Sequence, residues 1–475
     1  MGVLSVGDVM EFRLLVETPE PHGRPSIFLE EKYWSVTEPL DTSSPSDLAE
    51  YICISFVWGS GRTFNPLHPA VEMSDHTIPA VTAAIRNRDP DLSVSKIWID
   101  AFCMPIEPQA KRSTLESMGF IYSRARQVVV VLSNKAFAAI EEMGQVDPAK
   151  MSSSATDVLD TLENDAWMRS VWTYQEVVNS NDLIFTGNGV TGRFIRGRHF
   201  LNRFGNYLEA WKRANGCNSF GFREKYPTLD AFQDVVLDWW MAGYQGRSAL
   251  QVMSQMDRRH SAEPSNIFYA MIGAITNKPA WGGSYSSLES IAESFMELCE
   301  EKGDYSFIYT STERNKRSGW RPAPKILRSA LPWHCRGVAQ RGEKDPEGIR
   351  LKDIVILDKS TSIAEEGRVQ ILGMVKSSDE SQSDAALAEK TYSTLCQLGF
   401  AGSEAYIITT HGLFFPQWSI ASVPLLLWAS TSLAWNVFVP GMAVFLVEGE
   451  RRYIPGVYAG SIPKEGTHEV VIADT

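Results

Sequence analysis

Residues 51–58 read Tyr-Ile-Cys-Ile-Ser-Phe-Val-Trp, and a Gly-Ser-Gly turn follows them at 59–61. A run rich in β-branched and aromatic residues that ends at glycines predicts a buried strand. Three later runs share this character, at 96–100, 127–132 and 182–185. Segments with helical spacing lie between them, at 79–88, 110–126 and 166–179. The alternation predicts an α/β fold in which helices cover both faces of a mainly parallel sheet.

The carboxyl ends of these strands carry residues suited to binding, since ligands of such sheets lie at that edge. Trp58 and Gly59 follow the first strand, and Asp100 ends the second. The glycines at 59 and 61 would let backbone amides approach a phosphate, and a tight turn explains them equally well. Asp100 would contact a ligand or cap the segment that follows it.

The helix expected at 166–179 has two distinct faces. In a helical projection Trp167, Val171 and Tyr174 share one face, which we expect to pack in the core. Trp172 and Glu176 lie on the opposite face. A surface helix would be wholly polar there, so the tryptophan indicates that this face is covered or lines a cleft.

Composition and charge exclude several classes of protein. With 44% hydrophobic and 21% charged residues, the chain of 475 residues has a globular composition and room for two or three domains. Its formal net charge of −12 disfavours nucleic-acid binding, because the phosphate backbone is also negative. The six cysteines form no CxxC pair, so neither a zinc site nor a disulfide scaffold is expected. We expect a cytoplasmic protein with reduced thiols and no signal peptide.

Four regions are expected along the chain: an N-terminal lead-in at 1–48, an α/β domain at 49–190, a helical region at 191–340 and a β-rich region at 341–475. Strands are predicted in the last region at 369–373, 443–447 and 453–458. An apolar segment at 405–447 contains no Asp, Glu, Lys or Arg, and its part 413–435 is long enough to span a bilayer. Its two prolines and the lack of an adjacent basic cluster favour a buried β region instead, with membrane insertion as the alternative.

Three segments together resemble the fungal heterokaryon-incompatibility (HET) domain family. Tyr51–Gly59 resembles its first block, an apolar strand that ends in Ser-Tyr-x-Trp-Gly, and residues 97–103 with 118–132 resemble the second. Trp167-Met-Arg-Ser-Val-Trp-Thr-Tyr-Gln-Glu176 resembles the third. The family usually has Asn-Gln after the cysteine of its second block, whereas this chain has Met104-Pro-Ile-Glu107. The order of the blocks over about 125 residues carries the resemblance.

HET domains are in turn similar to TIR (Toll/interleukin-1 receptor) domains, which implies a TIR-like, flavodoxin-like sheet. In enzymatic TIR domains a glutamate cleaves nicotinamide from NAD, and the resemblance places that role on Glu176. The residues that would contact the ligand are Ser55, Trp58, Gly59, Asp100 and Trp172, the two tryptophans by stacking on a ring.

Glu176 and Cys103 each have a structural interpretation beside the chemical one. A carboxylate next to a ribose can stabilise an oxocarbenium-like transition state. Glu176 can equally pair with a nearby arginine or pack a domain interface, which is the preferred interpretation. Cys103 could act as a nucleophile only with a histidine partner, and a buried thiol is the preferred interpretation.

Three functions are therefore open. The first is a signalling protein of fungal non-self recognition and programmed cell death, which acts by self-association or with another incompatibility or immune-type protein and requires no cofactor. The second is an NAD-cleaving hydrolase that uses Glu176, with NAD as substrate. The third is a small-molecule enzyme that reuses the fold, which only the large C-terminal half supports.

Overall fold

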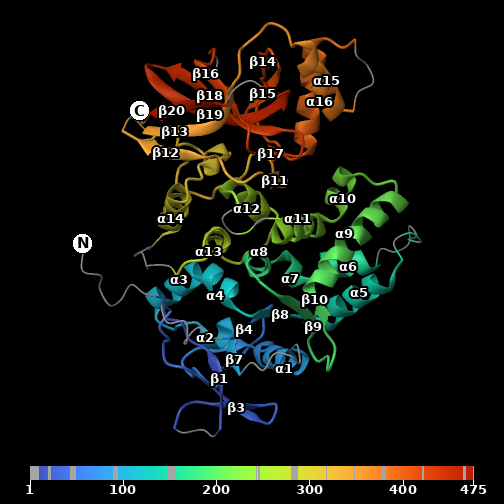
Figure 1. Cartoon of the computed structure of the whole chain (residues 1–475), viewed down its shortest axis with the longest axis vertical. Coiled ribbons are helices and arrows are strands. Elements are labelled where there is room, and N and C mark those ends of the chain that lie inside the picture. Colours follow the sequence, from blue (N-terminus) through green and yellow to red (C-terminus); the bar gives the residue numbers. More distant parts are fainter. Residues whose placement is uncertain are drawn as a thin grey trace. The chain divides into compact units, whose positions relative to one another are not determined.

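The computed structural model (Figure 1) describes residues 10–19, 23–42, 50–88, 95–147, 149, 151, 157–241, 243, 246–279, 287–316, 318–346, 348–376, 381–419, 422–463 and 467–473. The chain forms two compact units. The first contains residues 1–244 and 259–284, and the second contains residues 245–258 and 285–475. This division into two units does not test the boundaries of the four regions expected from the sequence, which stay predictions.

The first unit is built on a mixed eight-stranded sheet with the order β10-β9-β8-β4-β7-β1-β3-β2. Its centre is parallel, as predicted, because β7, β4, β8 and β9 pair parallel to one another. The remaining pairings are antiparallel. The strands are β1 (Leu15–Thr18), β2 (Ile27–Leu29), β3 (Lys32–Val36), β4 (Ile52–Phe56), β7 (Lys96–Trp98), β8 (Gln127–Leu132), β9 (Leu183–Gly187) and β10 (Ile195–Arg196).

Part of the segment expected as an N-terminal lead-in belongs to this sheet. Strand β1 pairs with β7, and β3 and β2 extend the sheet beyond it. Trp34 of β3 is 1% exposed, so these strands also supply core. A short separate hairpin, β5 (Arg62–Phe64) and β6 (Glu72–Ser74), follows the turn at 59–61.

Helices cover both faces of the parallel strands (Figure 1). Helix α1 packs on β4, β8 and β9. On the other face, α4 and α8 reach β4 through side chains, because Glu176 of α8 and Tyr122 of α4 are hydrogen-bonded in a group with Ser55 of β4. The helices are α1 (Thr77–Asn87), α2 (Asp100–Cys103), α3 (Pro108–Glu116), α4 (Met118–Arg124), α5 (Asn134–Gln145), α6 (Asp157–Glu163), α7 (Ala166–Arg169), α8 (Val171–Val178), α9 (Gly197–Ala214), α10 (Ser219–Lys225), α11 (Pro227–Met241) and α13 (Pro264–Ile275).

The single helix predicted at 110–126 is wrong, because the chain breaks at Ser117 into α3 and α4. Helix α4 then packs closely on α13. A Cβ placed on Gly119 would lie 2.0 Å from the carbonyl oxygen of Gly273. Only a glycine allows this approach of two backbones, so a distant segment of the chain decides the direction of α4.

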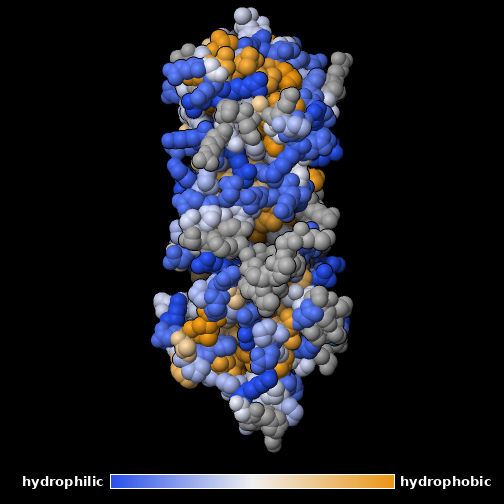
Figure 2. Space-filling model, turned by 90° about the vertical axis from the view of Figure 1, so that its left-hand side faces the viewer, coloured by the Kyte–Doolittle hydropathy of each residue, from blue (hydrophilic) through white to orange (hydrophobic). Residues whose placement is uncertain are grey.

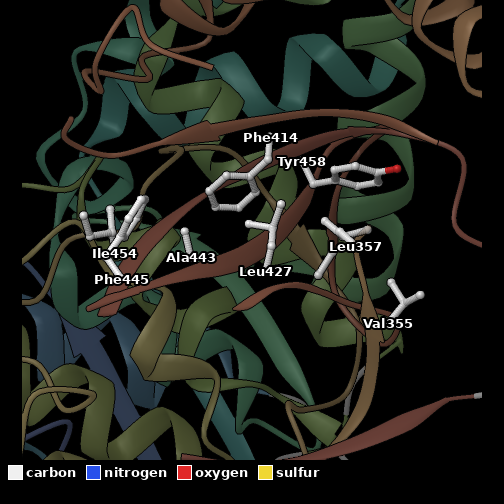
Figure 3. Close-up of a cluster of buried hydrophobic side chains, with 9 residues drawn as sticks. Val355, Leu357, Phe414, Leu427, Ala443, Phe445, Ile454 and Tyr458 are labelled. Atoms are coloured by element: carbon white, nitrogen blue, oxygen red, sulfur yellow. The ribbon is translucent and has the colours of Figure 1, made fainter. Parts of the chain in front are cut away.

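The C-terminal part of the second unit is β-rich, as the sequence predicts, and the pairing of its strands is antiparallel. Its main sheet has the order β12-β13-β16-β18-β19-β15-β14, and β20 pairs with β13. A core cluster of buried residues from several of these strands lies on the sheet (Figure 3). The sheet's strands are β12 (Gly342–Asp345), β13 (Gly348–Ile356), β14 (Ile407–Thr409), β15 (Gly412–Pro416), β16 (Leu426–Ser430), β18 (Val439–Val447), β19 (Glu450–Gly460) and β20 (His468–Ala473).

The remaining elements of this unit are a second small sheet and several helices. Strands β11 (Cys335–Arg336) and β17 (Ala434–Trp435) pair with each other. The helices are α12 (Ala249–Met256), α14 (Leu288–Glu301), the 3-10 turn η3 (Ser306–Tyr309), α15 (Glu365–Met374) and α16 (Asp384–Gln397).

The strand predicted at 369–373 is wrong, because these residues lie in α15. The short apolar run Val369-Gln-Ile-Leu-Gly373 suits a strand and a buried helical turn equally, and its spacing cannot distinguish them. Two glutamates in the first turn favour the helix. Ile371 and Leu372 are its buried apolar side chains, and the helix packs on β15 and β19.

The apolar segment at 405–447 forms strands in a buried β region, the preferred interpretation of its sequence. Residues 413–435 contribute to β15, β16 and β17, so the alternative of a membrane helix there is wrong. Among the described residues, no helix combines the length and the apolar character needed to cross a bilayer. On the face of the molecule seen in Figure 2, hydrophobic patches interrupt a mainly hydrophilic surface.

Candidate functional site

A cavity opens at the carboxyl edge of the parallel strands in the first unit. Its volume is about 790 Å³. Phe56 and Val57 at the end of β4 and Leu132 at the end of β8 line it, together with Ala80 of α1 and Trp167 of α7. Along the chain, β4 is followed by β7 and then by β8 in the parallel set. In the sheet, β7 lies on one side of β4 and β8 lies on the other. This reversal is the place where open α/β sheets bind ligands, and the cavity has the size of a small-molecule site.

The rim of the cavity is polar. Among the described residues it carries the cation Lys135 and the carboxylates Asp160 and Asp165. Other groups able to hydrogen-bond are on His76, Ser133, Asn134, Thr161, Asn164 and Asn188. Such a rim suits a ligand rich in hydroxyl and amide groups. In the part of the chain that the structure describes, no three His, Cys, Asp or Glu side chains gather to hold a metal ion.

Two rim residues are fixed by helix capping. The carboxylate of Asp165 accepts hydrogen bonds from the amides of Trp167 and Met168 and so begins α7. The Oγ of Ser133 accepts from the amide of Ala136 and begins α5. Ser133 also donates to Asp165 over 3.2 Å, which ties the two caps together beside the cavity. These hydrogen bonds to the helix starts hold the side chains of Asp165 and Ser133 at the cavity edge.

Glu176 lies inside the protein in a closed hydrogen-bonded group, only 8% exposed. Its Oε2 accepts from Ser55 Oγ over 2.5 Å, and its Oε1 accepts from the Tyr122 hydroxyl over 3.2 Å. The indole Nε1 of Trp167 donates to the same Ser55 Oγ over 2.7 Å. Burial raises the pKa of Glu176 to about 7, against the lowering effect of its donors. At neutral pH this carboxyl group is therefore poised between its two protonation states.

The helix predicted at 166–179 is wrong in one respect that matters for the site. The chain leaves helical geometry at Ser170, which ends α7 and caps α8. The amide of Val171 donates to the carbonyl of His260, and the amide of His260 donates to the carbonyl of Arg169. The projection that set Trp167 opposite Glu176 assumed an unbroken helix. With the break, both side chains meet at Ser55.

Asp100 and Trp58 form a second pair. The Trp58 indole Nε1 donates to Asp100 Oδ2 over 2.8 Å, and Asp100 Oδ1 also accepts from the amide of Ala101. Burial raises the pKa of Asp100 to about 6, although these donors lower it. The charge of Asp100 contributes to the raised pKa of Glu176, so the two carboxyl groups influence each other. Asp100 is the first residue of α2, whose N-cap is Ile99 without a side-chain cap, so the expected capping role is wrong and Asp100 instead accepts from Trp58.

The six residues proposed from the sequence thus divide into two bonded pairs and two single residues. Ser55 is bonded to Glu176, and Trp58 is bonded to Asp100. Gly59 lines the cavity, with a φ of 62° that favours glycine. Trp172 is half-buried on α8 and lies outside the described cavity lining. Whether any of them binds a ligand stays a prediction.

Two residues of the group were not proposed as site residues from the sequence, Trp167 and Tyr122. Trp167 was expected to pack in the core, and both side chains are buried. Each also uses its polar atom on the Ser55–Glu176 pair. Buried tyrosine and tryptophan usually have a partner for that atom, which is the signal that could have indicated them.

The buried thiols have surroundings that oppose nucleophilic chemistry. Burial raises the pKa of Cys103 to about 12, and its Sγ donates to the carbonyl of Ile97. Burial also raises the pKa of Cys53 well above its usual range. The ring of His68 is hydrogen-bonded to the carbonyl of Phe102, and that of His76 to the carbonyl of Val57. A protonated thiol is a poor nucleophile, which supports the structural interpretation of Cys103.

Comparison with known proteins identifies one segment. Residues 51–176 match the family model of the heterokaryon incompatibility protein (HET). The match begins at the residue before β4, ends at Glu176 and covers about a quarter of the chain. No curated protein and no solved structure matches the chain.

Proposed function

We propose that this chain, with its HET match at 51–176, acts in heterokaryon incompatibility, the fungal response of non-self recognition that leads to programmed cell death. The single observation that carries the proposal is that match. On this proposal the protein acts in the cytoplasm by associating with copies of itself or with another incompatibility protein. It needs no resident cofactor for that role.

The order of the parallel strands supports a TIR-like fold for the matched segment together with β9, which follows it in the chain. Numbered along the chain, the four parallel strands lie in the order 2-1-3-4. This is the beginning of the flavodoxin-like order, which the proposed TIR-like fold shares. The antiparallel strands β1, β2 and β3 are an addition at one edge of that sheet.

A second proposal, cleavage of NAD, is favoured by the position of Glu176. Its carboxyl group is buried and has a pKa of about 7. Ser55 connects it by hydrogen bonds to Trp167, which lines the cavity at the ligand edge. In the proposed reaction the bond between the ribose C1′ and the nicotinamide nitrogen breaks, and its electron pair leaves with nicotinamide. The Glu176 carboxylate stabilises the cationic ribose. Water then bonds to C1′ and releases a proton to the carboxylate or to solvent.

This reaction requires a rearrangement around Trp167. Trp167 lines the cavity and holds Ser55, whereas Glu176 is absent from the described lining. The indole must therefore move for the carboxylate to reach a ligand. Trp167 belongs to the short helix α7, which is bounded by the Asp165 cap and the break at Ser170, so α7 is the element whose shift would open the site.

The enzymatic proposal is tested by following nicotinamide release. Purified full-length protein would be incubated with NAD over a range of protein concentrations that allows assembly. The key variant is Glu176→Gln, and its matched control is Glu116→Gln. Glu116 is also a buried glutamate whose pKa burial raises to about 7, and it lies in α3, outside the cavity lining. Release that only Glu176→Gln abolishes supports the proposal. No release, or equal release from both variants, removes it.

The incompatibility proposal has a separate test. The wild-type chain, Glu176→Gln and the packing variant Gly119→Ala would each be expressed in fungal cells while growth and viability are followed. Growth arrest with the wild type and none with Gly119→Ala supports a role that needs the folded domain. Arrest that persists with Glu176→Gln assigns the signal to association rather than to NAD cleavage. Unchanged growth with the wild type, at an expression level that sedimentation shows to support self-association, contradicts the proposal.

A further inference from the structure

A second cavity, within the C-terminal unit, is built from two separate segments. Its volume is about 260 Å³. One wall is formed by residues 313–316 with Gly319, and the other is the beginning of β19 at 450–454. Trp418 completes the lining. All of these residues belong to one compact unit, and none belongs to the HET match.

Local backbone structure fixes both walls. Strands β18 and β19 are joined by Glu448 and Gly449, whose φ values of 54° and 86° are those of a two-residue type I′ turn. This turn places Arg451 and Arg452 at the start of β19. In the opposite wall, the amide of Asn315 donates to the carbonyl of Arg321 over 2.7 Å and holds the loop. The charged side chains therefore stand on constrained backbone.

The lining has an excess of positive charge. Its cations are Arg314, Lys316, Arg451 and Arg452, and its carboxylates are Glu313 and Glu450. Both carboxylates already have cationic partners, because Glu313 lies 2.8 Å from Lys325, and Glu450 lies 3.1 Å from Arg452. Lys316 and Arg451 are exposed and form no ion pair within the described residues. Three cationic groups, Arg314, Lys316 and Arg451, thus face a small cavity and form no ion pair within the described residues, although the charge of Glu313 also acts on Lys316.

Arg314 is the most constrained of these cations. Its guanidinium donates to the carbonyl oxygens of Ile308, Thr310 and Trp320. Its Nε is buried and has no hydrogen-bond partner among the described residues. Burial lowers the pKa of Arg314 to about 9, since no opposite charge offsets the loss of hydration. A bound anion would supply both the missing charge and a missing acceptor.

Apart from Asn315 and Gly319, the remaining surface of the cavity is aromatic and apolar. Tyr453 and Ile454 line it, and Ile454 belongs to the core cluster of Figure 3. Trp418 is half-buried and packs against the same cluster while it borders the cavity. The core thus holds these side chains in place, and they offer an organic group a rigid surface next to the cations.

We propose that this cavity binds a phosphate group carried by a small organic molecule. Arginine and lysine pair with phosphate by charge-assisted hydrogen bonds, and a dianion matches the excess of positive charge in this lining better than a single carboxylate does. The volume lies below that of most drug-sized sites, so the ligand is a phosphorylated metabolite of the size of a sugar phosphate rather than a dinucleotide. Trp418 contacts its organic part.

The test measures binding to the full-length protein by calorimetry, with glucose 6-phosphate, inorganic phosphate and gluconate as probes. Glucose 6-phosphate is expected to bind at least about tenfold more tightly than gluconate, because a charged hydrogen bond is worth about that factor. It is also expected to bind more tightly than inorganic phosphate, and Trp418→Leu should remove that second preference. No binding of any probe, or equal binding of gluconate, overturns the proposal. Equal binding of inorganic phosphate overturns the part assigned to the organic group.

Variants locate the binding in this cavity. Lys316→Gln and Arg451→Gln should each weaken glucose 6-phosphate binding about tenfold or more. Both side chains are exposed, so folding is not at risk, and thermal unfolding would verify this. The matched control is Arg336→Gln, an exposed arginine of β11 in the same unit that does not line the cavity. An equal loss in the control, or no loss in either cavity variant, would contradict the site.

Discussion

Ser55 Oγ donates a hydrogen bond of 2.5 Å to the carboxylate of Glu176, 121 residues later in the chain. The same oxygen accepts the indole N–H of Trp167. One hydroxyl therefore joins the strand that begins the HET match, the helix that ends it and the side chain that lines the cavity. This relationship makes the protonation of Glu176 accessible to experiment.

Replacing Glu176 by Gln should alter how stability depends on pH. The pKa of Glu176 is raised from 4.5 to about 7 in the folded protein. Between these values the folded protein holds a proton that the unfolded chain has released, so the free energy of unfolding falls as pH rises through this range. The wild type should lose about 2 to 3 kcal/mol from this group between pH 5 and pH 8. Glu176→Gln should lack that loss in urea unfolding, and identical pH profiles of the two proteins would contradict it.

Ser55→Ala should raise the pKa of Glu176 further, because the Ser55 hydroxyl lowers it now. The lost bond is to an ionised group at pH 8 and to a neutral group at pH 5. We expect a destabilisation of about 2 kcal/mol at pH 8 and about 1 kcal/mol at pH 5 in urea unfolding. Ser180→Ala is the control, since its buried hydroxyl donates to the neutral carbonyl of Val177 and its effect should not depend on pH.

Trp167→Phe should destabilise the first unit more than Trp98→Phe does. Both tryptophans are buried, and both have an aromatic neighbour, Phe185 for Trp167 and Tyr122 for Trp98. The Nε1 of Trp167 bonds to Ser55, whereas that of Trp98 has no partner among the described residues. The difference in the free energy of unfolding should be about 1 kcal/mol, the value of one hydrogen bond. A larger cost for Trp98→Phe would show that the bond at Trp167 adds nothing.

Gly119→Ala should destabilise the fold by about 3 kcal/mol or more, because the new Cβ meets backbone atoms that cannot move aside. It would lie 2.0 Å from the carbonyl oxygen of Gly273 and 2.3 Å from that of Thr276. Gly205→Ala is the matched control in α9, where no atom lies within 4 Å of the added Cβ. It should stabilise by about 0.5 to 1 kcal/mol, since alanine favours helix. Urea unfolding followed by tryptophan fluorescence distinguishes the two results.

The sequence predicted the parallel strands and the buried β region at 405–447 because their apolar runs are unambiguous. It did not predict which candidate residues are bonded to one another. Residues 369–373 form helix instead of strand, since a five-residue apolar run satisfies both periods. The N-terminal strands were not recognised as part of the sheet, because their place depends on the pairing of β1 with β7 far along the chain.

By itself, the sequence determined the α/β alternation and the segment that matches the HET family, because local apolar patterns and motif order are properties of the chain. The role of Glu176 stays a prediction from the resemblance. Only the tertiary structure decided that Glu176 is buried against Ser55. It also decided that Trp167 bonds to Ser55 and lines the cavity, whereas Trp172 lies outside the described lining. The reason is the break at Ser170. The Val171 amide finds its acceptor on His260, 89 residues later, and no local pattern encodes a hydrogen bond to so distant a carbonyl.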